Sequence, residues 1–138
     1  MKRLLYVLLL LPGLAQAGGT ISASGARFRY LLPQIPAGGY VTLKNDRDHK
    51  IIVTGASSPA CGMLMLHESK DESGMAMMMA VKSVTIEAHQ SFSFAPDGYH
   101  LMCDKPLMKI GQMVPVTLAF ADGTSMVIGF QVGGAGTQ

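Results

Sequence analysis

A histidine and a methionine lie two residues apart in the segment PDGYHLMCDK, which covers residues 96–105. Residues i and i+2 of a β-strand point to the same face, so the imidazole of His100 and the thioether of Met102 would sit side by side. Thioether and imidazole ligands together select a soft or borderline cation, and Cu(I) is the natural candidate. The pair therefore indicates one half of a soft-metal site.

Methionine is unusually frequent, with 11 in 138 residues. Methionine ordinarily fills gaps in a core, so a cluster of methionines is by itself weak evidence for a ligand. His67 changes this interpretation, because it lies between two methionine groups and supplies a second imidazole. We interpret the first group, Met63 and Met65, as core packing, and expect one ligand from the second group: Met75, Met77, Met78 and Met79.

Other metal chemistries fit these residues less well. Zinc sites use Cys, His and carboxylate ligands rather than thioethers. A blue-copper centre needs a cysteine thiolate, usually with a histidine and a methionine close behind it on one loop, and no histidine follows Cys103. Methionine cannot be lost to disulfide formation in an oxidising compartment. Neutral ligands should also bind less tightly than thiolates, which indicates a carrier that releases its cargo.

No catalytic constellation accompanies these residues. Asp71 and Glu72 have no partner acid or nucleophile, so we interpret them as part of a solvated turn. His49 and His89 lie in polar turn contexts, RDHK and EAHQ, with no second ligand nearby in sequence, and we expect both at the surface. The sequence therefore predicts a binding protein and not an enzyme.

The first 17 residues have the pattern of a secretory signal peptide. Lys2 and Arg3 precede an apolar run over residues 4–11, and residues 15–17 read Ala-Gln-Ala. Because Pro12 ends the run well short of the roughly 20 residues of a membrane span, we expect cleavage and no stable membrane insertion. No cysteine follows the cleavage site, so a bacterial lipid anchor is not expected. The expected product is a monomeric periplasmic domain of residues 18–138.

Loss of Lys2 and Arg3 takes the formal net charge from +2 to 0, which argues against a nucleic acid as partner. The mature region also predicts an all-β fold, because short alternating or apolar runs are broken by Gly, Pro, Asn and Asp. We predict a single antiparallel sandwich or barrel domain. Its strands cover residues 26–32, 39–45, 49–55, 63–69, 75–81, 84–88, 90–95, 98–103, 114–120 and 126–132.

Four segments between these strands carry turn chemistry. The C-terminal GGAGTQ is expected to fray. The predicted turns are PAGG at 36–39, NDRD at 45–48, PDG at 96–98 and ADG at 121–123.

The spacing of four residues resembles the motif of the periplasmic copper chaperones called PCu(A)C, which is H-x10-M-x21-H-x-M. The residues His67, Met78, His100 and Met102 match all four positions without a gap. Similar framing segments, from GYVTLKN at 39–45 to VPVTLAF at 114–120, extend the resemblance over nearly all of residues 18–138. The match favours Met78 over its neighbours, although a β-bulge would shift the register to one of them.

The resemblance implies a cupredoxin-like Greek-key β-barrel that binds one Cu(I) per chain and lacks an electron-transfer site. It also implies delivery of copper to the dinuclear centre of cytochrome c oxidase subunit II, alongside a Sco-type thiol protein. This chain has Ser69 where family members commonly carry a further methionine. Two alternatives stay open: copper sequestration for tolerance, and a thiol redox protein that uses Cys61 and Cys103.

Those two cysteines permit one disulfide in an exported chain. The alternative is that Cys61 and Cys103 are small buried hydrophobic residues. If residues 98–103 form a regular strand, Cys103 points away from the face that His100 and Met102 share. Tyr99 either covers the metal or packs in the core.

Overall fold

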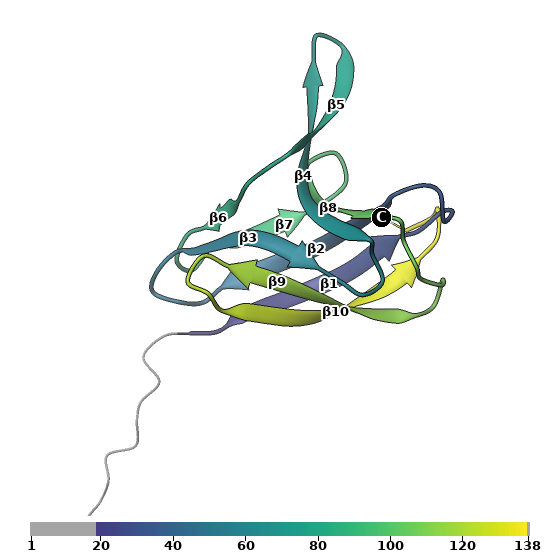
Figure 1. Ribbon diagram of the computed structural model, residues 1–138. Coiled ribbons are helices and arrows are strands. Elements are labelled where there is room, and N and C mark those ends of the chain that lie inside the picture. The colour runs from purple at the N-terminus through teal and green to yellow at the C-terminus, as the bar shows by residue number, and fades with distance from the viewer. Residues whose placement is uncertain (1–18, 138) are drawn as a thin grey trace, which may run out of the picture.

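The computed structural model describes residues 19–137 as a rolled all-β structure (Figure 1). Ten strands are confirmed where they were predicted, although the first begins at Ile21 rather than at residue 26. The described residues form no helix that could cross a membrane. The predicted signal peptide, residues 1–17, lies outside the described residues. The strands are β1 (Ile21–Arg29), β2 (Ala37–Asn45), β3 (Ile51–Ser57), β4 (Met63–Glu72), β5 (Met75–Ala80), β6 (Val84–Ile86), β7 (Ser91–Phe94), β8 (Tyr99–Asp104), β9 (Met113–Phe120) and β10 (Ser125–Gly133).

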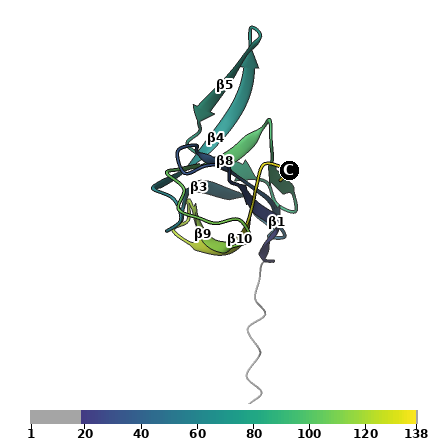
Figure 2. The same ribbon diagram turned by 90° about the vertical axis from the view of Figure 1, so that its right-hand side faces the viewer.

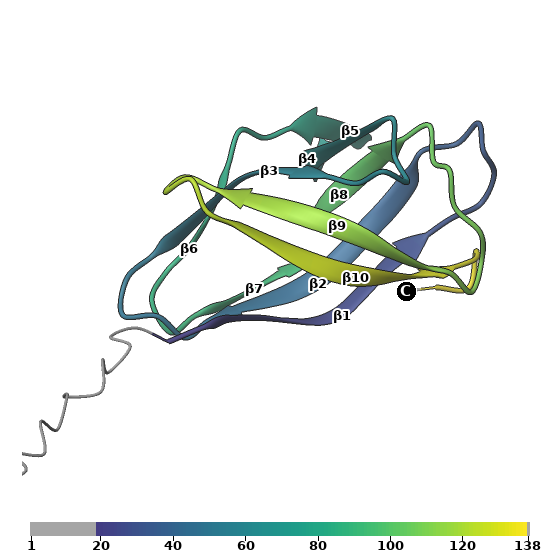
Figure 3. The same cartoon turned by 60° about the horizontal axis from the view of Figure 1, so that its bottom comes forward.

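All ten strands belong to one sheet, in the order β5-β4-β8-β2-β1-β10-β9-β3-β6, with β7 added on β2. The pair β1 and β10 is parallel, and the other strand pairs are antiparallel. Alternation along β9 buries one of its faces, because Val114, Val116, Leu118 and Phe120 are buried. The sheet therefore rolls around a single apolar interior, as Figures 2 and 3 show.

The hairpin of β4 and β5 projects beyond the rolled sheet (Figures 1 and 2). Strand β4 runs to Glu72, three residues beyond the predicted end, so Asp71 and Glu72 belong to a strand and not to a turn. The turn consists of Ser73 and Gly74, with φ values of 54° and 78°. Positive φ at both central residues is typical of the tight turns that match the twist of a hairpin.

The predicted turn at PAGG is wrong, because Ala37, Gly38 and Gly39 lie inside β2. Their small size serves close packing. A Cβ atom on Gly38 would come within 2.6 Å of the Tyr40 hydroxyl, and one on Gly39 within 2.8 Å of the Phe28 ring. The glycines were therefore a packing signal rather than a turn signal.

The other three predicted turns are confirmed, with Asp97 at φ 65° in PDG and Gly123 at φ 87° in ADG. The described part of the C-terminal segment makes hydrogen bonds. The backbone N–H of Thr137 donates to the Gly134 carbonyl at 3.0 Å, and Nε of Arg29 donates to the Ala135 carbonyl at 3.3 Å. Residues 134–137 thus fold back beside the end of β1.

Candidate metal centre

Two histidines face each other on neighbouring strands. In the antiparallel pairing of β4 with β8, His67 lies directly opposite His100. Their ring centroids are 5.8 Å apart and their planes meet at 60°. Directly opposed residues of an antiparallel pair point to the same face of the sheet. The two imidazoles, which are far apart in the sequence, therefore share one small volume.

The orientation of His100 is fixed by the turn that precedes it. A carbonyl oxygen can only accept a hydrogen bond, so Nδ1 of His100 carries the proton and donates to the Gly98 carbonyl at 3.0 Å. This leaves Nε2 with its lone pair free. Histidine ligands of metals usually show this arrangement, in which a backbone carbonyl holds the other ring nitrogen.

Two buried imidazole nitrogens have no hydrogen-bond partner among residues 19–137: Nε2 of His100 and Nδ1 of His67. Only 5% of the His100 surface is exposed. Buried polar atoms are nearly always paired, so each such exception calls for an explanation, and an absent ion is one. One free nitrogen on each of two opposed imidazoles is a donor set that a metal ion would complete.

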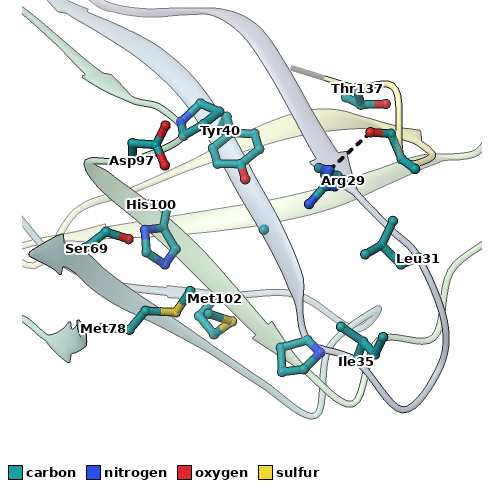
Figure 4. Close-up of a pocket in the computed structure, with 14 residues that line it drawn as sticks. Arg29, Leu31, Ile35, Tyr40, Ser69, Met78, Asp97, His100, Met102 and Thr137 are labelled. Atoms are coloured by element: carbon teal, nitrogen blue, oxygen red, sulfur yellow. Dashed lines mark hydrogen bonds between the residues drawn. The ribbon is translucent and has the colours of Figure 1, made fainter. Parts of the chain in front are cut away.

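The strand register also places two thioethers on this face. Met102 follows His100 by two residues on β8, and Met78 of β5 lies opposite Ser69, which follows His67 by two residues on β4. Residues two apart and residues directly opposed share a face, so all these side chains point the same way. Figure 4 shows the Met78 and Met102 side chains close together below His100.

The neighbours of Met78 point elsewhere. Met77 lies opposite Lys70, and Met79 lies opposite Glu68, so both belong to the other face of the hairpin. The β4–β5 register is continuous from His67 to Glu72, without the bulge that could have moved another methionine into this position. Among the methionines of β5, Met78 is therefore the one whose side chain lies on the same face as His67 and His100.

A groove of about 600 Å³ opens over this face. Met78, Met102 and His100 line one side, as Figure 4 shows. His67 is not among the lining residues, but its ring packs edge-on against that of His100. Tyr40 of β2 forms part of the wall, because its hydroxyl lies over Gly38, the residue opposite Met102. The groove is further lined by Arg29, Leu31, Ile35, Pro36, Ser69, Pro96, Asp97, Ala135 and Thr137.

Sequence reasoning missed this wall. Neither Tyr40 nor Arg29 has a spacing to the histidines that would mark it, because strand neighbours far apart in the chain bring them there. Met65 is a different case, since it lies two residues before His67 and opposite Met102. It is half-buried on the face of the candidate ligands, and strand parity alone could have placed it there.

The assignment of Met63 and Met65 to the core is wrong. Met63 is 57% exposed, and the buried residues of β4 are Leu64 and Leu66, on the opposite face. The apolar leucines alternate with the methionines and take the interior positions. This leaves the thioethers of β4 on the outer surface of the sheet.

The pKa of His67 is lowered, first because partial burial disfavours the charged imidazole and second because His100 would add a like charge beside it. Only the neutral imidazole can ligate a metal. Burial, with His100 beside it, therefore keeps His67 in the ligating form at mildly acidic pH.

The two cysteines form a disulfide, Cys61–Cys103, with Cα atoms 5.3 Å apart. Cys103 is fully buried, on the opposite face of β8 from Met102, as the alternation predicts. The bond ties the start of β4 to the end of β8, and its 42-residue span contains every candidate ligand. No thiolate is available to the metal site.

Three other predictions are decided by burial. His49 and His89 are exposed, and Nε2 of His89 lies 3.1 Å from a carboxylate oxygen of Asp48, so both are surface residues as predicted. Tyr99 packs against the core, with its ring centroid 5.3 Å from that of Phe92. Within the described range, no group of three or more His, Cys, Asp and Glu residues could hold a metal ion. The candidate ligand set is not of that kind, because it combines two histidines with two methionines.

Comparison with known families gives one family match and one curated relative. The model of the family described as "Putative lipoprotein LpqE-like" matches residues 21–132. The relative is "Putative lipoprotein Lxx21020" of Leifsonia xyli subsp. xyli (strain CTCB07), 36% identical over 93 residues. The match covers 65% of this chain and 56% of that protein. The chain thus spans little more than half the length of the curated relative.

Solved structures with the same fold include copper proteins. The solution structure of CuI-DR1885 from Deinococcus radiodurans has a TM-score of 0.65 and 31% identity, covering 86% of this chain and 81% of that chain. The copper-bound PCuAC domain from PmoF2 has a TM-score of 0.69 at 18% identity, covering 86% of this chain and 96% of that chain. The PCuAC-type β-barrel expected from the four-residue motif is confirmed.

Proposed function

Because the chain belongs to the LpqE-like family and has the fold of PCuAC domains, we propose that it is an exported Cu(I) metallochaperone. It holds one Cu(I) as cargo between His67, Met78, His100 and Met102. It is a carrier and performs no bond chemistry on a substrate. The proposal is supported by the copper named in the descriptions of its structural neighbours, CuI-DR1885 and the copper-bound PCuAC domain from PmoF2.

One observation carries the proposal. The register of three strands gathers two thioethers and two imidazoles on one face, and each imidazole keeps a buried nitrogen without a partner. A structural histidine pair would be expected to satisfy those nitrogens. Two imidazoles and two thioethers are neutral, soft or borderline donors, and this donor set suits Cu(I) better than Zn²⁺, Mg²⁺ or Ca²⁺.

The unequal exposure of the ligands favours release of the copper ion. Met78 is 62% exposed at the rim, whereas His100 is buried at the base. A ligand from an acceptor protein can therefore replace Met78 first while the histidines still hold the ion. Copper then leaves by stepwise ligand exchange, and no electron or proton needs to be transferred for the thioether step. The groove beside Met102 gives room for the incoming side chain.

The acceptor we propose is the dinuclear copper centre of cytochrome c oxidase subunit II, with a Sco-type protein as a possible companion in the same assembly. The family resemblance supports this acceptor and a location in the bacterial periplasm. The signal peptide predicted at residues 1–17 and the description of the family as lipoproteins support export. The thiol redox alternative is disfavoured because Cys103 is fully buried within its disulfide.

A Cu(I) titration against a colorimetric chelator, with X-ray absorption at the copper edge, tests the proposal. We expect one strongly bound equivalent with mixed nitrogen and thioether scattering. His89→Ala and Met113→Leu are matched controls, since both residues are exposed and lie outside the site. Absence of binding, or a shell of thiolates, would reject the site. Tight retention of copper in the presence of the oxidase subunit would instead indicate sequestration.

A further inference from the structure

Strand β5 is an exposed apolar edge. Its sequence MAMMMA has no charged residue, and all six residues are exposed. It pairs with β4 and stands at the end of the strand order, so its outer edge has no partner among the described strands. Proteins usually protect such edges with charges, prolines or bulges, because an exposed apolar edge promotes association. The exposed methionines of β5 therefore indicate a function other than core packing.

The methionines of β5 divide between two faces. Met78 points to the face of His67 and His100, as described above. Met75, Met77 and Met79 lie opposite Glu72, Lys70 and Glu68, which places their side chains on the other face. These three are 68%, 45% and 43% exposed, so none of them contributes to the core. Three exposed thioethers thus form a row on the hairpin face that continues from the buried Leu64 and Leu66.

The surroundings of this row favour a soft cation over other ligands. Residues two apart in a strand lie about 6.8 Å apart, so the flexible side chains of Met77 and Met79 can lean together over one ion. Two of the charged side chains beside them form an ion pair: Nζ of Lys70 lies 3.8 Å from a carboxylate oxygen of Glu68. Three thioether sulfurs share this face with the carboxylates of Glu68 and Glu72, and of these donors the thioethers select Cu(I).

We propose that Met77 and Met79 form a second, weaker Cu(I) site on the face of the hairpin opposite Met78, with Met75 as an additional donor. This site uses none of the four ligands of the proposed chaperone site and goes beyond that function. It lacks imidazole ligands and is open to solvent, so its affinity is lower and it exchanges copper readily. A loading site of this kind would collect Cu(I) from a donor.

The location of the second site makes transfer to the first one short. Met78 lies between Met77 and Met79 in sequence and projects from the opposite face of the same strand. Because β5 is an edge strand, no further described strand separates its two faces along the outer edge. Copper can pass around this edge by exchange of one thioether for another. The ion remains Cu(I), and only metal–sulfur bonds form and break.

The test is an anaerobic Cu(I) titration of the purified protein, labelled with ¹³C at the methionine methyl groups and followed by NMR. We expect two equivalents, the second bound at least about tenfold more weakly than the first. The methyl signals of Met77 and Met79 should shift with the second equivalent. The Met77→Leu, Met79→Leu double variant should keep the first equivalent and lose the second, while Met113→Leu should keep both.

His100→Ala separates this proposal from the chaperone site. If the second site exists, this variant loses the strong equivalent and retains the weak one with the same methionine shifts. Saturation of the unmodified protein at one equivalent would overturn the second site. So would a second equivalent that persists in the double variant. Met77→Gln with Met79→Gln repeats the experiment without adding branched apolar side chains to the exposed edge, should the leucine variant associate.

Discussion

His67 and His100 lie directly opposite each other on β4 and β8, with ring centroids 5.8 Å apart and a buried, unpaired nitrogen on each ring. The relationship depends on the β4–β8 register, because a shift of one residue would turn one imidazole into the core. The pKa of His67 is lowered first by partial burial and second by this neighbouring imidazole. The predictions below follow from this pair and from the strands around it.

Replacement of His100 by alanine should remove strong Cu(I) binding. The change deletes the most buried donor, whose Nε2 is free because Nδ1 is held by the Gly98 carbonyl. We expect the affinity to fall by about 100-fold or more, which corresponds to roughly 2.7 kcal/mol. A chelator competition measures the loss, and circular dichroism checks that the barrel remains folded. An unchanged affinity in the folded variant would refute the role of His100.

The two faces of β5 can be separated by single substitutions. Met78→Leu keeps the apolar character of the side chain and removes the sulfur, so the affinity for the first Cu(I) should fall by about tenfold, or about 1.4 kcal/mol. Met79→Leu changes the adjacent residue on the opposite face and should leave the first equivalent unchanged. Chelator competition on both variants compares them. Equal effects, or a larger effect at Met79, would contradict the assignment by register.

Copper affinity should decrease as the pH falls, because a protonated imidazole cannot ligate. The pKa of His67 lies below its ordinary value of 6.5, so His67 stays neutral to a lower pH than a free imidazole would. Most of the loss at this residue should therefore occur below pH 6.5. Affinity measured from pH 8 to pH 5, with proton release per copper, checks this. Pure thioether coordination would show no pH dependence.

The same lowered pKa affects the stability of the metal-free protein. The unfolded chain binds a proton at His67 more readily than the folded chain does. The free energy of unfolding therefore rises with pH between the folded-state pKa and the ordinary value of 6.5. The contribution is complete above about pH 6.5 and is lost as the pH falls through the lower folded-state pKa. Urea unfolding at several pH values measures it. The His67→Gln variant is the control, and it should lack this component of the pH dependence.

The disulfide should matter for stability and not for ligation. Removing a crosslink over 42 residues costs about 4 kcal/mol of unfolding free energy in the chain-entropy model. The Cys61→Ser, Cys103→Ser double variant should therefore unfold at lower denaturant concentration. While folded, it should still bind one strong equivalent of Cu(I), because Cys103 faces the interior. Loss of copper binding in the folded variant would restore a role for the thiols.

Local patterns in the sequence predicted the strands well, and their failures have physical causes. The alternation of β9 and the turn signals at PDG and ADG are properties of neighbouring residues, and all were confirmed. The turn predicted at PAGG was wrong because Gly38 and Gly39 make room for Tyr40 and Phe28, and a local pattern does not reveal this packing. The prediction that Met63 lies in the core was wrong because the leucines that alternate with the methionines of β4 take the core positions.

The sequence by itself determined that this chain folds as a β-barrel and that His67, Met78, His100 and Met102 have the spacing of a copper motif. Only the tertiary structure decided that these four side chains share one face, that Met77 and Met79 occupy the other, and that Cys61 reaches Cys103. The physical reason is register. Side-chain direction along one strand follows from the chain, but the residue that lies opposite on the next strand is set by turns, packing and distant partners.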